Sequence, residues 1–446
     1  MDFLSLMPSF GSFLWTVVAF VVALSVIVAV HEFGHYIVAR WCGIRSEVFS
    51  IGFGPRLWSR VDRNGTRWQI AALPFGGYVK FLGDANAASS GADAAVLSRL
   101  SESERRRTMH GAPLWARSAT VAAGPVFNFL LSVIVFAGLF LWQGVAIEQP
   151  TVGTIGALPG AVAEVQPGDR ILSVGGIDTP DYEALMDAGA ALPPAASYDY
   201  RVLRGGQERV VAGPVPYPAR VASVAAGSAA WDAGLEVGDV ILAAGGQTLR
   251  SFPDLQAAVK AAGGAPIELL VWRSGKERTL TLTARRTDIP LRAGGFETRY
   301  LIGITGDFFF TPATEPLGPV KAVTAAASQT WFVIRSSLSG LWHMVTGAIS
   351  PCNLRGPLGI AETSGAAASQ GPADFISFIA ILSTAVGLLN LFPIPMLDGG
   401  HLVFHAWEWA RGRPPSDRVV NIAMTVGLTM VLALMAFGLT NDLFCP

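Results

Sequence analysis

The stretch FLWTVVAFVVALSVIVAVHEFGH, residues 13–35, ends an uncharged apolar run with two histidines and a glutamate. An ionised side chain near the centre of a bilayer costs about 2.5–3.5 kcal/mol on insertion scales, so ionisable groups clustered here need a compensating partner. His31 and His35 are four residues apart and project from the same face of a helix, where they can share a ligand. A divalent metal ion is the partner we expect.

The composition indicates an integral membrane protein that also has a water-soluble portion. Of the 446 residues, 51% are hydrophobic and 15% are charged, and the mean hydropathy is +0.44. Uncharged apolar stretches long enough to cross about 30 Å of hydrocarbon predict four spans. They are residues 13–30, 118–144, 375–397 and 419–439. The net charge of −1 gives no reason to expect a nucleic-acid partner.

Lysine and arginine residues orient these spans, because loops rich in them remain in the cytoplasm. The segments joining spans one and two and spans three and four are basic, whereas residues 1–39 and 440–446 contain neither lysine nor arginine. The pattern predicts that both termini and the long segment 145–374 lie on the non-cytoplasmic side. The ends of spans one and three then meet towards the cytoplasm.

Residues 145–288 contain a divergent internal repeat. The stretches VQPGDRILSVGG (165–176) and LEVGDVILAAGG (235–246) align across a Gly-Asp pair, each with a turn, an apolar strand and a second turn. The pattern resembles two tandem α+β PDZ domains, over residues 145–215 and 216–288. Such modules bind an extended peptide as an added strand, and we expect grooves near residues 152–155 and 221–224. A purely steric role is the alternative.

Four further segments carry weaker signals. Residues 49–54 and 68–80 are apolar, aromatic and glycine-rich, which predicts strands associated with the membrane and lining a protein cavity. Residues 85–107 are polar and predict a mobile, solvated loop. Residues 320–349 form an amphipathic pattern suited to a helix on the outer membrane surface, although packing against the second repeat would produce the same pattern.

The cysteines do not form a recognisable disulfide framework. There are three, and Cys42 is expected in the cytoplasm. Cys352 and Cys445 could both lie on the oxidising side, but nothing in their spacing predicts that they pair.

The motif HEFGH (31–35) predicts a zinc hydrolase in which Glu32 faces a water molecule rather than the ion. A catalytic zinc site has three protein ligands and one open position, so a third ligand is needed. Asp398, in the stretch NLFPIPMLDGG (390–400), is the candidate because it lies at the cytoplasmic end of span three. His401 and His405 form a rival pair that lacks an adjacent glutamate.

Taken together, HEFGH, the Leu-Asp-Gly core at 397–399 and the paired repeats between spans two and three resemble the site-2 protease family over essentially the whole chain. The resemblance implies a zinc-dependent intramembrane metalloendopeptidase with one zinc ion. His31, His35 and Asp398 would be its ligands and Glu32 its catalytic base. It also implies substrate-binding roles for Asn390 and for Asn128, which lies in the stretch GPVFN (124–128).

The expected fold is a polytopic α-helical membrane protein with about four spans, a membrane-associated strand region and two PDZ-like domains. Its expected parts are residues 1–144 with the first two spans, the repeats 145–215 and 216–288, a connector 289–374, and 375–446 with the last two spans. The resemblance implies a multi-pass protein of the bacterial inner membrane, with its termini and repeats in the periplasm and its active site towards the cytoplasm.

The expected partners are the lipid bilayer, a single-span membrane protein substrate and a protease that trims this substrate beforehand. The substrate class would be an anti-sigma-factor-like protein cleaved in the envelope stress response, with signal peptides as a second class. Two alternatives compete with this interpretation. One is a non-enzymatic PDZ scaffold, and the other is a zinc membrane peptidase of another family, for which Glu47 would be a poor third ligand.

Overall fold

The computed structural model describes residues 10–84, 93–160, 164–290 and 296–445. The chain forms two compact units. The first comprises Met1–Gly138, Val320–Trp342 and Leu354–Cys445, and the second comprises Leu139–Pro319 and His343–Asn353.

Four helices are long and apolar enough to cross a membrane, as the composition predicts. They are α1 (Phe10–Trp41), α4 (Leu114–Gln143), α10 (Pro372–Asn390) and α12 (Asp417–Phe444). The predicted third span, residues 375–397, extends beyond the helix of the structure. Helix α10 ends at Asn390, and residues 391–397 form a turn. Pro393 and Pro395 explain this, since proline cannot donate a helical hydrogen bond and disfavours helix in the residue before it. After this turn α11 (Asp398–Arg411) begins.

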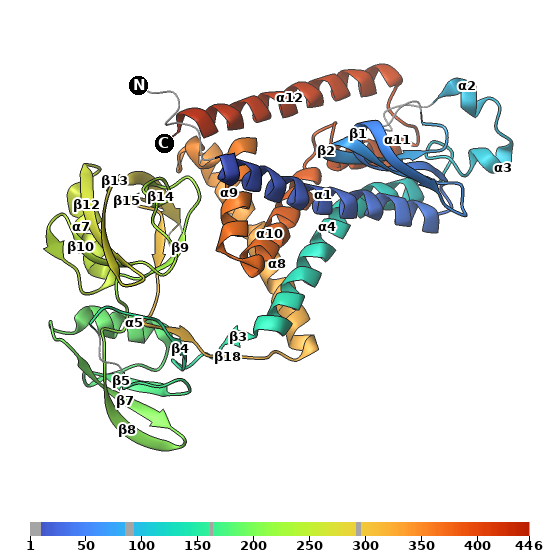
Figure 1. Cartoon of the computed structure of the whole chain (residues 1–446). Coiled ribbons are helices and arrows are strands. Elements are labelled where there is room, and N and C mark those ends of the chain that lie inside the picture. The colour runs from blue at the N-terminus through green and yellow to red at the C-terminus, as the bar shows by residue number, and fades with distance from the viewer. Residues whose placement is uncertain (1–9, 85–92, 161–163, 291–295, 446) are drawn as a thin grey trace. The chain divides into compact units, whose positions relative to one another are not determined.

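Strands β1 (Ser46–Val61) and β2 (Arg67–Phe81) confirm the predicted strand region and lie beside the C-terminal half of α1 (Figure 1). Residues 48–51 of β1 pair with 77–80 and also with 67–70, while residues 56–61 pair with 67–71. The two strands therefore bend, and four segments lie side by side with 77–80 at one edge. Gly52 and Gly76 have φ of +86° and +124°, which permits these bends.

Two elements of the first unit differ from expectation. The predicted loop 85–107 contains the short helices α2 (Ala94–Leu97) and α3 (Glu102–Arg105), although its residues 85–92 lie outside the described part. Helix α9 (Pro357–Gln370) lies within residues 289–374, for which we predicted only a connector with a surface helix. It packs against α1. Small residues allow this close approach, because a Cβ on Gly365 would lie 2.4 Å from Thr16 Oγ1.

In the second unit the two repeats have the same sheet order. Strands β5 (Arg170–Val174), β6 (Ile177–Asp178), β7 (Tyr198–Arg204) and β8 (Gln207–Gly213) are ordered β6-β5-β7-β8. Strands β10 (Val240–Ala244), β11 (Gln247–Thr248), β12 (Pro266–Arg273) and β13 (Lys276–Thr283) are ordered β11-β10-β12-β13. The helices are α5 (Tyr182–Ala191) in the first repeat and α6 (Ala229–Asp232) and α7 (Phe252–Ala262) in the second. The repeat read from the sequence is therefore a repeat of structure.

The chain after residue 288 returns to both repeats. A hairpin of β14 (Arg285–Pro290) and β15 (Phe296–Leu301) leads to β16 (Ile304–Gly306), which pairs with β9 (Val221–Val224). Next, β17 (Phe310–Pro312) pairs with β4 (Val152–Ile155), and β18 (Thr314–Glu315) pairs with β3 (Val145–Ala146). Strands β4 and β9, where we expected peptide grooves, thus each have a partner strand from their own unit.

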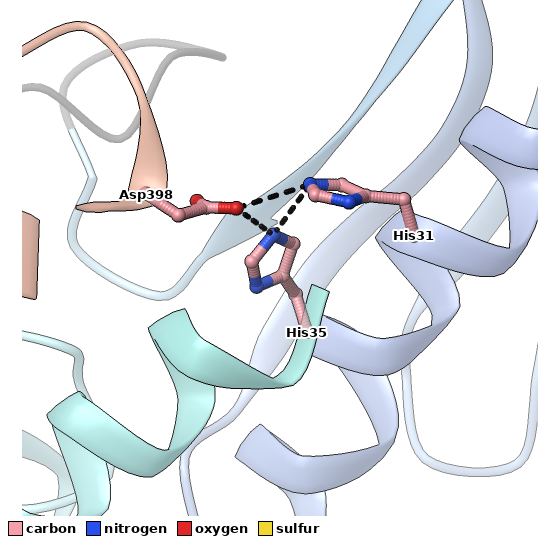
Figure 2. Close-up of side chains that lie close together, drawn as sticks. All are labelled: His31, His35 and Asp398. Carbon is pink, nitrogen blue, oxygen red and sulfur yellow. Dashed lines mark hydrogen bonds and ion pairs between the residues drawn. The ribbon is translucent and has the colours of Figure 1, made fainter. Parts of the chain in front are cut away.

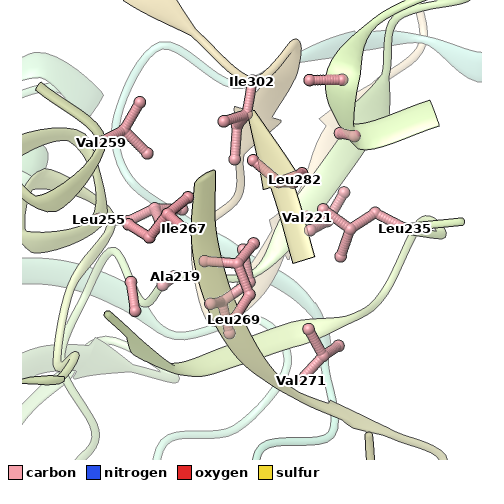
Figure 3. Close-up of a cluster of buried hydrophobic side chains, with 14 of the residues drawn as sticks. Ala219, Val221, Leu235, Leu255, Val259, Ile267, Leu269, Val271, Leu282 and Ile302 are labelled. Carbon is pink, nitrogen blue, oxygen red and sulfur yellow. The ribbon is translucent and has the colours of Figure 1, made fainter. Parts of the chain in front are cut away.

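Each repeat has its own hydrophobic core. The core of the second repeat gathers buried aliphatic side chains from β9, α7, β12 and β13 around Leu255 and Leu269, and it includes Ile302 from the returning segment (Figure 3). The core of the first repeat is built around Tyr200 and includes Phe309 and Phe310, also from that segment.

The aspartate that recurs in the two Gly-Asp pairs has a structural role. Asp169 is fully buried and accepts two hydrogen bonds from Arg204, of 2.7 and 2.6 Å. Asp239 and Arg273 repeat this arrangement in the second module, with both hydrogen bonds at 2.7 Å. Hydrogen bonds from Arg204 and from the backbone of Gln166 outweigh the effect of burial and lower the pKa of Asp169.

Helix α8 (Pro319–Val345) lies before α9, within the predicted connector. Helix α8 confirms a helix in the predicted amphipathic segment, with Trp331, Phe332 and Trp342 exposed. The short 3-10 helix Pro351–Asn353 follows it. Cys42 is a free thiol.

Candidate metal centre and active site

The structure brings together three side chains that lie far apart in the sequence. His31 and His35 project from adjacent turns of α1, and Asp398 is the first residue of α11 (Figure 2). The Nε2 atoms of the two histidines are 3.2 Å apart, and Asp398 Oδ2 lies 3.1 Å from that of His31 and 3.5 Å from that of His35. Among the described residues, this is the one cluster that could hold a metal ion.

The three atoms fit a zinc ion. Two ligand atoms on a tetrahedral zinc, each at about 2.0–2.1 Å from it, are about 3.3 Å apart. All three separations are close to this value, and each atom can offer a lone pair. In the described structure Asp398 Oδ2 is buried and contacts both imidazoles as ion pairs but forms no hydrogen bond, so a cation between the three atoms would satisfy them.

Tight turns place Asp398 at this point. A Cβ on Gly399 would lie 2.3 Å from the carbonyl oxygen of Phe392, and one on Gly400 would lie 2.3 Å from that of Ile394. No larger residue fits without displacing the backbone. The glycines after the aspartate are thus required for the turn that carries α10 into α11.

Glu32 lies beside the ligands and the edge of the sheet. It lines a cavity of about 490 Å³ together with His31, His35 and Asp398. The backbone of Val79 hydrogen-bonds to Glu32, and a Cβ on Gly77 would lie 3.1 Å from Glu32 Cγ. The edge segment 77–80 of β2 therefore contacts the carboxyl group that the motif assigns as a base.

The two asparagines take different positions. Asn390, the last residue of α10, lines the cavity and donates a hydrogen bond to the carbonyl of Val386 at 3.0 Å. Asn128 is fully buried in α4 and lies behind His31, with its Nδ2 atom 3.2 Å from His31 Nδ1. Only Asn390 is thus among the residues that line the cavity.

The rival ligands lie outside the cluster. His401 lines the cavity, and His405 Nδ1 is 3.1 Å from Ser118 Oγ. Burial, together with the nearby charge of Arg117, lowers the pKa of His405 to about 4. Glu47 forms an ion pair with Lys80 at 3.2 Å. None of the three belongs to the group that could hold a metal.

Several residues that support the site were not predicted from the sequence. Arg117, at the start of α4, forms two hydrogen bonds of 3.0 and 2.6 Å with Glu408 of α11, so the two helices are joined next to the ligands. The carbonyl oxygen of Thr120 lies 2.8 Å from His35 Nδ1. An arginine at the edge of an apolar span is the signal that could have prompted a search for a carboxylate partner.

These features define a polytopic membrane protein with a site suited to metal-dependent hydrolysis. Residues 19–434 match the peptidase family M50, and the chain belongs to this family. It is therefore a metalloendopeptidase, and the resemblance to the site-2 proteases is confirmed.

Similarity to individual relatives covers nearly the whole chain. A protein of Agrobacterium fabrum, named provisionally as a zinc metalloprotease, is 36% identical over 444 residues, which are 98% of each chain. The regulator of sigma-E protease of Salmonella typhimurium is 34% identical, and the protease RseP of Yersinia pestis is 35% identical. Both alignments cover 97% of this chain and 99% of the relative.

Proposed function

We propose that this protein is a zinc-dependent endopeptidase that cleaves membrane proteins within their transmembrane segments. One zinc ion would be held by His31, His35 and Asp398. The observation that supports this most strongly is the convergence of three ligand atoms, at 3.1–3.5 Å from one another, from residues about 360 positions apart. The names of the relatives, which include zinc metalloproteases, agree with zinc as the metal.

The residues of the site divide the chemical work. When bound, a zinc ion supplies a Lewis acid that polarises a carbonyl group and makes water more acidic. Glu32 removes a proton from the attacking water and delivers it to the amine that leaves. Asn390 lines the cavity, where its amide can hydrogen-bond backbone groups of the substrate.

A transmembrane helix protects its own carbonyl groups by hydrogen bonding, so the substrate must unwind before it is attacked. The edge segment 77–80, which contacts Glu32, is suited to pair with the unwound chain as an added strand. Substrates that contain helix-weakening residues should therefore be cleaved faster than otherwise similar substrates with a strongly helical span.

Chelation tests the proposed activity. Purified full-length protein in detergent should contain one zinc ion per chain and cleave a model single-span substrate inside its span. A strong chelator should abolish cleavage, and added zinc should restore it. Cleavage that persists after the metal has been removed would contradict the proposal. Absence of both zinc and cleavage would favour the alternative of a non-enzymatic scaffold.

The proposed location is the bacterial inner membrane. The distribution of lysine and arginine favours termini and repeats in the periplasm and an active site towards the cytoplasm. The two repeats would be PDZ-like domains, and the exposed tryptophans of α8 suit the membrane surface. By analogy with the sigma-E regulator, the substrate would be an anti-sigma-factor-like protein, and signal peptides are a second candidate class.

The repeats would act as a gate that excludes a substrate until another protease has trimmed its outer part. The pairing of β16 and β17 with β9 and β4 means that a clean deletion must remove residues 145–315 and not stop at 288. With a flexible linker in their place, the variant should cleave untrimmed substrate. A pre-trimmed substrate, cleaved equally by both proteins, is the control. Undiminished preference for trimmed substrate in the deletion variant would reject the gate.

A further inference from the structure

The hydrogen bonding of Asn128 is incomplete. Its side chain is fully buried, with Nδ2 at 3.2 Å from His31 Nδ1. Its other amide atom, Oδ1, is also buried and has no hydrogen-bond partner in the described structure. A buried amide oxygen without a donor is unfavourable by about 1–3 kcal/mol, so this position calls for an explanation.

A metal ion bound to His31 changes which amide atom of Asn128 fits next to the imidazole ring. If His31 binds a metal through Nε2, its Nδ1 atom carries the ring proton and is a donor. A metal-binding histidine normally donates this second N–H to an oxygen, which fixes its tautomer and orientation. The oxygen and nitrogen of an amide exchange places by rotation of the side chain. With Asn128 rotated, Oδ1 accepts the hydrogen bond from His31 Nδ1.

We propose that Asn128 is a positioning residue that orients His31 through a hydrogen bond from His31 Nδ1 to Asn128 Oδ1. This inference rests on the proposed zinc site. It replaces the substrate-binding role that the family resemblance implies for Asn128, and it agrees with the position of this residue behind His31 rather than in the cavity wall.

The second histidine is oriented from the same helix. His35 Nδ1 lies 2.8 Å from the carbonyl oxygen of Thr120, the acceptor that a ligand histidine requires. Thr120 and Asn128 are eight residues apart on α4, so they lie on one face of the helix. This face thus presents one oxygen acceptor to each imidazole.

Hydrogen bonds to α10 hold this face of α4 in place. The Ser383 hydroxyl donates to the backbone carbonyl of Asn128 at 2.9 Å, and the Ser132 hydroxyl donates to that of Ala380 at 2.7 Å. A Cβ on Gly387 would lie 3.1 Å from the Cβ of Asn128. The buried contacts fix the rotation of α4 and hence the direction of the Asn128 side chain.

Two substitutions of nearly equal size test the proposal in the full-length protein. Asn128→Leu removes the acceptor, whereas Asn128→Asp retains an oxygen acceptor. The dissociation constant for zinc is measured by competition with a chromogenic chelator. We expect Asn128→Leu to weaken zinc binding by about 10–100-fold and Asn128→Asp to stay within about threefold of the wild type. Phe136→Leu, at another buried position of α4 about two turns from Asn128, is the packing control and should bind zinc normally.

The outcomes separate the possible roles. Normal zinc affinity in Asn128→Leu would overturn the proposal, and a raised KM with that normal affinity would favour substrate binding. If Asn128→Leu does not fold, Asn128→Ala, which introduces no clash, takes its place and should still bind zinc more weakly. If the wild-type protein itself binds no zinc, the proposed function fails and not merely the role of Asn128.

Discussion

Replacement of Glu32 by glutamine is expected to abolish peptide-bond cleavage and to leave the zinc content at one ion per chain. Glutamine has nearly the same size but cannot accept the proton of the attacking water, and loss of a general base reduces rates by about 10²–10⁴-fold. Glu32 is not in the ligand cluster, so metal binding should persist. The measurement is single-turnover cleavage of a model substrate, with zinc quantified in the same preparation.

A second glutamate of the same unit provides a matched control. Glu47 pairs with Lys80 and lies outside the ligand cluster, so Glu47→Gln should retain cleavage within a few-fold of the wild type. Near-normal turnover in Glu32→Gln would remove Glu32 from the mechanism. Loss of zinc in that variant would indicate instead that the carboxyl group takes part in metal binding.

The spans and the proximity of His31, His35 and Asp398 could be predicted because both follow from strong constraints. About twenty consecutive apolar residues are needed to cross a bilayer, and few other structural elements contain so long an apolar run. Charged groups near such a span need partners, so His31 and His35 predict an acidic residue on the same side of the membrane. Asp398 satisfied that condition, and the structure places it 3.1 Å from His31.

Other features depend on contacts that no local pattern encodes. The strands β16 and β17 are three residues each, too short for a detectable alternation, and they pair with residues 80 or more positions earlier. The pairing of β1 with two separate segments of β2 depends on bends at glycines. Glycine is equally common in ordinary loops, so it does not predict these bends. The ion pair of Arg117 and Glu408 joins residues 291 positions apart.

Substitution of Gly124 by alanine is expected to impair the metal site although it favours the helix. Gly124 lies in α4, where alanine is about 1 kcal/mol more favourable than glycine in a helix interior. A Cβ at this position would lie 2.4 Å from His35 Nε2 and 2.8 Å from His31 Cε1. Neither imidazole can retreat freely, because each is held through its Nδ1 atom by Thr120 or Asn128.

The added methyl group must therefore displace the ligand atoms or separate α4 from α1. Displacements of about 0.5 Å in the atoms of a metal or catalytic site are enough to impair function. We therefore expect the affinity for zinc to fall at least tenfold and the rate of cleavage at least a hundredfold. Gly138→Ala is the matched control, because a Cβ on Gly138 of the same helix meets no atom within 4 Å. That variant should retain zinc and activity. If Gly124→Ala binds zinc as tightly as Gly138→Ala, then α4 does not confine the imidazoles as the geometry requires.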